Sequence, residues 1–179
     1  MNILINFIAF QLGWFACVLG GAYGWPWAGT GLAMVIVALH LARAQDPAPE
    51  LALIALAALL GAAFDSLLVT LGWLSYASGT LVQGTAPHWI VALWMLFATT
   101  LNVTLRWLKG RWALGAMLGA VAGPLAYLAG HKLGALEFVN LSNGLIALAV
   151  GWGLLMPALM ALSVRFDGMT TARWANQPT

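Results

Sequence analysis

Long stretches of hydrophobic residues dominate the chain, and short polar turns separate them. A transmembrane helix needs about 20 mostly apolar residues. Six stretches reach or approach this length, and glycine, proline or charged residues bound each of them, as at helix ends. The pattern therefore predicts a single transmembrane domain over residues 1–179, with six spans at about 3–21, 26–43, 50–72, 88–107, 112–133 and 143–164.

The composition supports this assignment. Hydrophobic residues make up 63% of the chain and charged residues 7%, whereas soluble domains carry about a quarter charged residues. So few charges cannot cover the surface of a soluble domain. A transmembrane barrel would need alternating apolar and polar positions, but the runs here are rich in Ala, Leu and Gly without alternation. The expected class is an all-α integral membrane protein.

The basic residues predict the orientation, because Lys and Arg concentrate in the cytoplasmic loops of membrane proteins. Only Lys132 falls in a connection on the opposite side from the other six. Those six lie in the second connection, the fourth connection and the C-terminal tail: Arg43, Arg106, Lys109, Arg111, Arg165 and Arg173. We therefore expect both termini in the cytoplasm.

Tryptophans lie near the predicted ends of the spans, as in the aromatic belts at membrane interfaces. The expected outer belt contains Trp25, Trp27, Trp73 and Trp89, and the expected inner belt contains Trp107, Trp112 and Trp174. A weak repeat relates spans two and three, which begin near Trp25, to spans four and five, which begin near Pro87. Both copies would run in the same direction.

Asp65 lies within the third span, about 10 Å below the expected outer interface at 1.5 Å per residue. A carboxyl group at this depth costs a few kcal/mol unless it is paired, hydrated or protonated. It is either a functional acid that faces the interior of the bundle or a structural acid paired with a neighbouring helix.

Other polar groups in the outer half are candidate partners for Asp65. His88, Tyr127 and His131 could line a cavity with it that opens to the outer side, together with Lys132, Glu137, Asn140 and Asn143. The three histidines lack the spacing of a metal site. The sequence therefore predicts no metal and no cofactor.

Two further features have both a packing and a functional interpretation. Asn6 and Gln11 in the first span could hydrogen-bond another helix or the headgroup of a substrate. His40 and Asn102 could likewise hydrogen-bond either another helix or a substrate. Glycines at 115, 119 and 123 form a small-residue stripe on the fifth span, which suits close packing within the bundle or in a dimer.

Three segments carry a family resemblance: Asn6–Phe15 with its Gln11 and Trp14, Pro87–Ala98 with its Trp89 and Trp94, and Gly123–Tyr127. Together they resemble a family of small bacterial inner-membrane proteins classed as a domain of unknown function. The resemblance extends over nearly the whole chain and implies a bacterial inner-membrane location. It supplies no catalytic residues.

The leading functional hypothesis is a membrane protein that binds or modifies a hydrophobic substrate, such as a lipid. Asp65 would be the acid of an enzyme, and His88, Tyr127, His131, Asn6 and Gln11 would contact the substrate. Whether the protein is an enzyme stays open. The alternatives are a small proton-coupled transporter and a non-catalytic scaffold that contacts a second copy or another membrane protein. The net charge of +2 gives no indication of nucleic-acid binding.

Overall fold

The computed structural model describes residues 2–169, so Arg173 and Trp174 lie outside the described residues. The described part of the chain forms six α-helices, one 3-10 helix and two short strands. Their bounds are α1 Ile3–Ala22, α2 Pro26–Leu41, α3 Pro47–Thr70, β1 Leu74–Tyr76, α4 His88–Leu101, η1 Arg106–Leu108, α5 Trp112–Lys132, β2 Leu136–Phe138 and α6 Leu141–Arg165.

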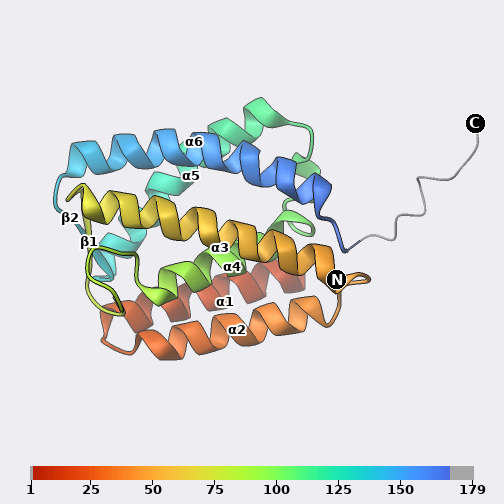
Figure 1. Cartoon of the computed structure of the whole chain (residues 1–179), viewed down its shortest axis with the longest axis horizontal. Coiled ribbons are helices and arrows are strands. Elements are labelled where there is room, and N and C mark those ends of the chain that lie inside the picture. Colours follow the sequence, from red (N-terminus) through yellow and green to blue (C-terminus); the bar gives the residue numbers. More distant parts are fainter. Residues whose placement is uncertain (1, 170–179) are drawn as a thin grey trace, which may run out of the picture.

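The six helices run alternately up and down as three hairpins, α1–α2, α3–α4 and α5–α6 (Figure 1). Helix α4 is the central element, because it packs against α1, α2, α3 and α6. Strands β1 and β2 pair at one end of the bundle, which we call the sheet end. The opposite end holds the connections from α2 to α3 and from α4 to α5, and we call it the basic end.

Four helices are long and apolar enough to cross a membrane, namely α1, α3, α5 and α6. Helices α2 and α4 are also apolar but contain 16 and 14 residues. Helix α4 ends at Leu101, short of the expected end at residue 107. Beyond Leu101 the chain turns, with the Leu105 amide donating to the Thr100 carbonyl. The Asn102 side chain there bonds to Glu50 on α3.

Glycines at positive φ end α1, α3 and α5 at the sheet end. Gly24, Gly72 and Gly134 have φ angles of 77°, 67° and 83°, a conformation that other residues adopt at a cost. In each turn the backbone N–H of the residue after the glycine donates to the carbonyl five residues before it, a hydrogen bond typical of helices that end at glycine. These bonds are Trp25 to Gly20, Trp73 to Leu68 and Ala135 to Gly130.

An approximate two-fold axis passes through the strand pair. Residues 71–76 (LGWLSY) and 133–138 (LGALEF) have the same pattern 62 residues apart. Their strands pair antiparallel, with Ser75 opposite Glu137 at the centre, and the amides of Ala77 and Val139 make matching bonds to the carbonyls of Ala135 and Trp73. The axis therefore relates the end of α3 and β1 to the end of α5 and β2, and the two copies run in the same direction. The predicted repeat of spans two and three in spans four and five stays a prediction.

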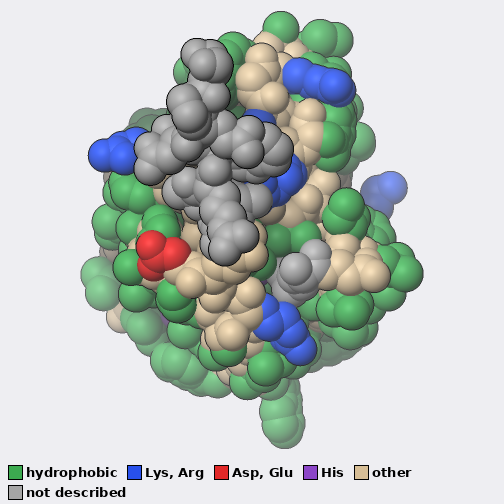
Figure 2. Space-filling view, turned by 90° about the vertical axis from the view of Figure 1, so that its right-hand side faces the viewer, with side chains coloured by type: hydrophobic (Ala, Val, Ile, Leu, Met, Phe, Trp, Pro, Cys, Tyr) green, Lys and Arg blue, Asp and Glu red, His purple; other side chains and the backbone are tan. Residues whose placement is uncertain are grey.

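Lys and Arg side chains gather on the basic end (Figure 2). The elements that meet there carry Arg43, Arg106, Lys109, Arg111 and Arg165, while Lys132 ends α5 at the sheet end. Trp25 and Trp27 are exposed at the sheet end, and Trp107 and Trp112 at the basic end. Trp89 was wrongly expected in the outer belt. Its ring is 1% exposed, and its indole N–H donates to the Ser78 carbonyl.

Candidate functional site

Asp65 on α3 is fully buried and accepts three hydrogen bonds. The hydroxyls of Tyr76 and Tyr127 donate to Oδ1 at 2.7 and 2.6 Å. The indole N–H of Trp94 donates to Oδ2 at 2.7 Å. All three donors are uncharged, so the carboxyl group is held by neutral partners alone among the described residues.

The internal repeat relates two of these groups to each other. Asp65 and Tyr127 occupy equivalent positions on α3 and α5, 62 residues apart. Trp94 on α4 stacks on Trp152 on α6, with ring centroids 4.6 Å apart and planes inclined by 12°. The site therefore combines one acid, two phenols and two indoles.

Glycines make room for the two indole rings. A Cβ at Gly61 on α3 would collide with the ring of Trp94, and a Cβ at Gly123 on α5 would collide with Trp152. These two glycines are also 62 residues apart, like Asp65 and Tyr127. A Cβ at Gly119 would likewise collide with the backbone of Trp152 and with Met156 on α6. The glycine stripe on α5 therefore packs inside the bundle, which is one of its two predicted roles.

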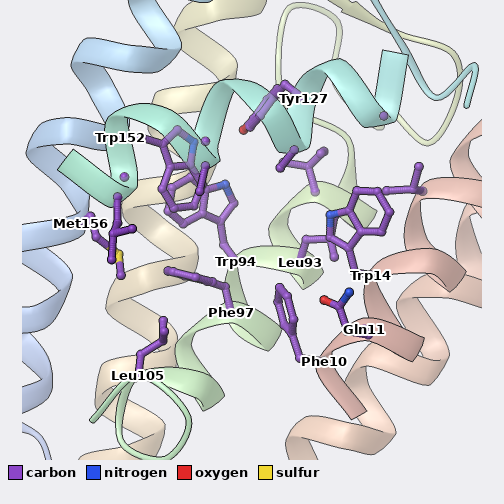
Figure 3. A pocket seen from close by; sticks show the side chains of 18 of the residues that line it. Phe10, Gln11, Trp14, Leu93, Trp94, Phe97, Leu105, Tyr127, Trp152 and Met156 are labelled. Atoms are coloured by element: carbon purple, nitrogen blue, oxygen red, sulfur yellow. The ribbon is translucent and has the colours of Figure 1, made fainter. Parts of the chain in front are cut away.

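A cavity of about 520 Å³ opens between α1 and α5 (Figure 3). Helix α4 forms its floor and α6 one of its walls, and its lining is almost entirely apolar and aromatic. The labelled residues around it are Phe10, Gln11, Trp14, Leu93, Trp94, Phe97, Leu105, Tyr127, Trp152 and Met156.

Asp65 lies directly behind this cavity. Trp94 and Tyr127 line the cavity and also donate to Asp65, whereas Asp65 itself is not part of the lining. Its carboxyl group is 0% exposed. It can therefore fix the orientation of two wall residues, and a molecule in the cavity would meet their rings before it met the acid.

The structure places the two predicted histidines elsewhere. The Nδ1 atom of His88 is 2.8 Å from the Thr30 hydroxyl, and its ring stacks on Trp27 at 3.9 Å. It lines a separate cavity of about 340 Å³ that lies between α2 and α4. The Nδ1 atom of His131 lies 3.1 Å from the Leu136 carbonyl, next to the strand pair. Neither side chain bonds to Asp65.

The two amide side chains predicted as site residues in the first span lie in different surroundings. Asn6 is buried, donates to the Thr99 carbonyl at 3.2 Å and accepts from the Thr104 hydroxyl at 2.6 Å. It thus joins α1 to the end of α4. Gln11 instead lines the cavity. Of the predicted site residues, the structure brings Tyr127 to Asp65 and Gln11 to the same cavity.

Sequence reasoning missed Tyr76, Trp94 and Trp152 as members of the site. The repeat of LGWLSY in LGALEF was a signal for the faces of α3 and α5, although not for the two tryptophans. With a 62-residue spacing, it aligns Asp65 with Tyr127 and Gly61 with Gly123. It would have indicated that α3 and α5 present equivalent faces and that the acid faces its counterpart.

A second polar cluster at the basic end was also missed. Glu50 begins the buried face of α3 and is 0% exposed. Its Oε2 lies 2.8 Å from Nε2 of His40, and its Oε1 accepts from the Asn102 amide at 2.5 Å and from the Gly168 backbone N–H at 3.0 Å. This cluster joins α2, α3, the end of α4 and the segment after α6. Neither cluster gathers three His, Cys, Asp or Glu side chains, and no such group occurs in residues 2–169.

The architecture is that of an all-helical protein with four helices suited to crossing a membrane. Residues 3–158 match the model of the family described as "Protein of unknown function (DUF2878)", and the chain belongs to this family. The match confirms the resemblance to a family of unknown function, and it includes Asp65, Trp94, Tyr127 and Trp152. Neither the search of curated proteins nor the search of solved structures gave a match.

Proposed function

We propose that this protein is a bacterial inner-membrane protein that binds a hydrophobic or amphiphilic molecule, such as a membrane lipid, in the cavity between α1 and α5. The observation that carries this proposal is the cavity itself. It is apolar and opens between two helices, and Asp65 holds two of its wall residues in place. All six helices cross the membrane, with both termini in the cytoplasm.

The distribution of side chains supports this placement. Large apolar residues are exposed on the outer helices, including Phe7 and Phe15 on α1 and Leu154 on α6. Basic residues gather on one end, which suits the cytoplasmic side. Helix α4, at about 21 Å, is shorter than the hydrocarbon core of about 30 Å. Four other helices pack around it, so its length need not match the bilayer.

The dimensions of the cavity suit a chain-like ligand. Its lining on α5 extends from Leu118 to Gly130, which is about 18 Å at 1.5 Å per residue. One half of the bilayer core is about 15 Å thick. A single acyl or isoprenoid chain that lies along the helices would therefore occupy the cavity, and it would enter sideways from the bilayer between α1 and α5.

The alternatives have less support. A proton-coupled transporter needs polar groups from one face to the other. Between Glu50 and Asp65, however, the buried positions of α3 are Leu53, Ile54, Ala57 and Gly61. A scaffold would use the glycine stripe of α5 as its contact, but Gly119 and Gly123 already face α6. Binding is therefore the function that the geometry favours, and Asp65 is a positioning residue rather than a direct catalyst.

Native mass spectrometry with lipidomics on the purified protein tests the proposal. Ala126 lines the cavity, so Ala126→Trp should fill it and remove a lipid or isoprenoid that copurifies with the wild type. Ala38→Trp is the control, because Ala38 is exposed on α2. A defined ligand lost only in Ala126→Trp, and altered in Asp65→Asn, supports the proposal. The same bulk phospholipid in all four proteins would contradict it.

A further inference from the structure

The cavity between α1 and α5 has an uncharged wall. Its lining residues, all in the described part of the chain, include no Lys, Arg, His, Asp or Glu. A charged group of either sign would lose its water there without gaining an oppositely charged partner, and an unpaired charge in an apolar site is costly. The lining therefore favours a ligand whose enclosed part is uncharged.

Four side-chain donors on this wall are not available to a ligand. The indole N–H of Trp89 donates to a backbone carbonyl, and the indole N–H of Trp94 and the hydroxyl of Tyr127 donate to Asp65. The indole N–H of Trp152 is covered by its neighbours and has no hydrogen-bond partner in residues 2–169. Any side-chain hydrogen bond to a ligand must therefore come from the rest of the lining.

Gln11 and Trp14 of α1 carry the polar groups that remain on the wall. Both are half-buried and line the cavity, and they lie three residues apart, hence on the same face of the helix. Figure 3 shows them on one side of the cavity, with Trp152 and Met156 of α6 on the other. Their side chains form no hydrogen bond to other described residues. Together they offer three N–H donors and one acceptor oxygen, so they suit a ligand that supplies an acceptor.

The depth of Gln11 limits which part of a ligand can meet it. At 1.5 Å per residue, Gln11 lies about 12 Å from the start of α1 at Ile3 and about 17 Å from its end at Ala22. The hydrocarbon core of a bilayer is about 30 Å thick, so Gln11 of a spanning α1 lies near its middle. An oxygen that meets Gln11 therefore belongs to the body of a ligand and not to a phospholipid headgroup.

We propose that the ligand of this cavity is an uncharged lipid with a hydrogen-bond-accepting oxygen, such as that of a ketone, ester or ether, within its apolar body. Gln11 and Trp14 bind this oxygen, and the apolar body lies along the helices. This inference rests on the proposed binding function and adds the charge and the polar group of the ligand to it. A plain hydrocarbon chain would fill the same space but would leave both donors unpaired.

Four probes with the same two octyl arms and different central groups test the proposal. Dioctyl ketone carries an uncharged acceptor, and heptadecane carries no polar group. Dioctyldimethylammonium and dioctyl phosphate place a positive and a negative charge at the same point of the chain. Apparent dissociation constants are measured with radiolabelled probes and the immobilised full chain in an uncharged detergent. Each probe is compared between protein variants, so its partition into micelles cancels.

Ala126→Trp, which fills the cavity, defines cavity binding. It should weaken the binding of dioctyl ketone and of heptadecane at least about tenfold. Any binding of the two charged probes should be the same in this variant as in the wild type, because the uncharged wall does not admit their central groups.

The polar group is assigned by substitutions on α1. Gln11→Leu should weaken the binding of dioctyl ketone about threefold to tenfold, as expected for the loss of one hydrogen bond. Heptadecane binding should not change, which also shows that the cavity is intact. Gln83→Leu is the matched control, because Gln83 is exposed between β1 and α4 and does not line the cavity. Trp14→Phe removes one N–H and should weaken ketone binding about threefold; it decides the question if Gln11→Leu loses both uncharged probes.

The outcomes separate this inference from the proposed function. Cavity binding of either charged probe as tight as that of dioctyl ketone, or ketone binding unchanged in both Gln11→Leu and Trp14→Phe, overturns the assignment. If dioctyl ketone and heptadecane are then still lost in Ala126→Trp, the proposed binding function stands without it. If Ala126→Trp changes neither probe binding nor the copurified lipid, both proposals are wrong.

Discussion

Helix α3 carries two fully buried acids, Glu50 near its start and Asp65 near its end, and their surroundings differ. Glu50 pairs with the imidazole of His40 and accepts from Asn102 and the backbone of Gly168. Its partners come from three separate segments of the chain. Asp65 has only neutral partners, and two of them form the wall of a cavity.

The difference separates two uses of a buried acid in an apolar bundle. Glu50 joins segments that meet at one end of the molecule and lines neither of the two cavities described above, which suits a structural role. Asp65 orients Trp94 and Tyr127 toward an open space. We therefore expect changes at Glu50 to affect mainly stability, and changes at Asp65 to affect mainly what the cavity binds.

The largest expected effect is that of removing Glu50. Glu50→Ala leaves His40 and Asn102 without their partner, and breaking a buried pair costs about 3–5 kcal/mol. Asp65→Asn retains an acceptor for the tyrosines but leaves the Trp94 N–H facing an amide, at about 1–3 kcal/mol. Unfolding in mixed micelles, followed by circular dichroism, gives both free energies. A larger loss for Asp65→Asn would reverse the comparison.

The second-largest expected effect concerns the packing of Trp94, a residue of the cavity wall, against α3. Gly61→Ala places a methyl group against the ring of Trp94, and this overpacking should cost about 1–3 kcal/mol. The near-ultraviolet circular dichroism of the stacked Trp94 and Trp152 should change with it.

Gly31→Ala is the control for this change. An added Cβ at Gly31 on α2 meets nothing within 4 Å, so its effect should stay within about 1 kcal/mol and follow helix propensity. Equal effects of the two substitutions would show that Trp94 is not held as described.

A smaller effect distinguishes the two tyrosines that bond to Asp65. Tyr76→Phe and Tyr127→Phe each remove one hydrogen bond, at about 0.5–1.5 kcal/mol. Only Tyr127 lines the cavity, so only Tyr127→Phe should alter the copurified ligand in native mass spectrometry. If Tyr76→Phe alters ligand binding as much, the cavity extends further toward the strand pair than described.

The smallest effect concerns the basic end. Partial burial acts to raise the pKa of Asp167, but its bonds to Lys109 and Arg106, at 2.8 and 3.0 Å, outweigh this and hold the pKa below its usual range. Burial lowers the pKa of Lys109, although Asp167 opposes this. Since Lys109 titrates on the alkaline side, only Asp167 loses its charge in acid.

The sign of the pH dependence follows from the lowered pKa of Asp167. The carboxylate stabilises the folded state above its unfolded pKa of about 3.9, and this contribution is lost as the pH falls through the folded pKa. Asp167→Asn should therefore be less stable than the wild type at pH 7 by up to about 1 kcal/mol. The difference should shrink as the pH falls below about 3.9 and through the lower folded pKa of Asp167. A difference that does not change with pH would contradict the ion pairs.

The sequence predicts the number of helices because each apolar run ends in a turn residue such as Gly24, Gly72 or Asp46. It does not predict where α4 ends. The apolar pattern continues past Leu101, and the chain turns there because Asn102 bonds to Glu50, 52 residues earlier. Hydropathy cannot register a bond between residues so far apart in the sequence.

The candidate site was predictable in part. Asp65 stands out because an acid in an apolar span is costly. Its partners do not stand out, because Tyr76 and Trp94 read as ordinary interfacial or packing residues until the helices are placed. The histidines were misleading for a related reason. Their position at span ends suggested proximity to Asp65, but His88 faces α2 and His131 faces the strand pair.

The approximate two-fold axis has a consequence for which residues can occupy equivalent positions in the site. Two identical subunits that met across such an axis would place the same residue on both sides, so an acid at this position would face a second acid and repel it. Because both halves belong to one chain, they can differ, and Asp65 faces Tyr127 at 2.6 Å. Because the two halves are joined in one chain, an approximately symmetric backbone can carry a single acid at its centre.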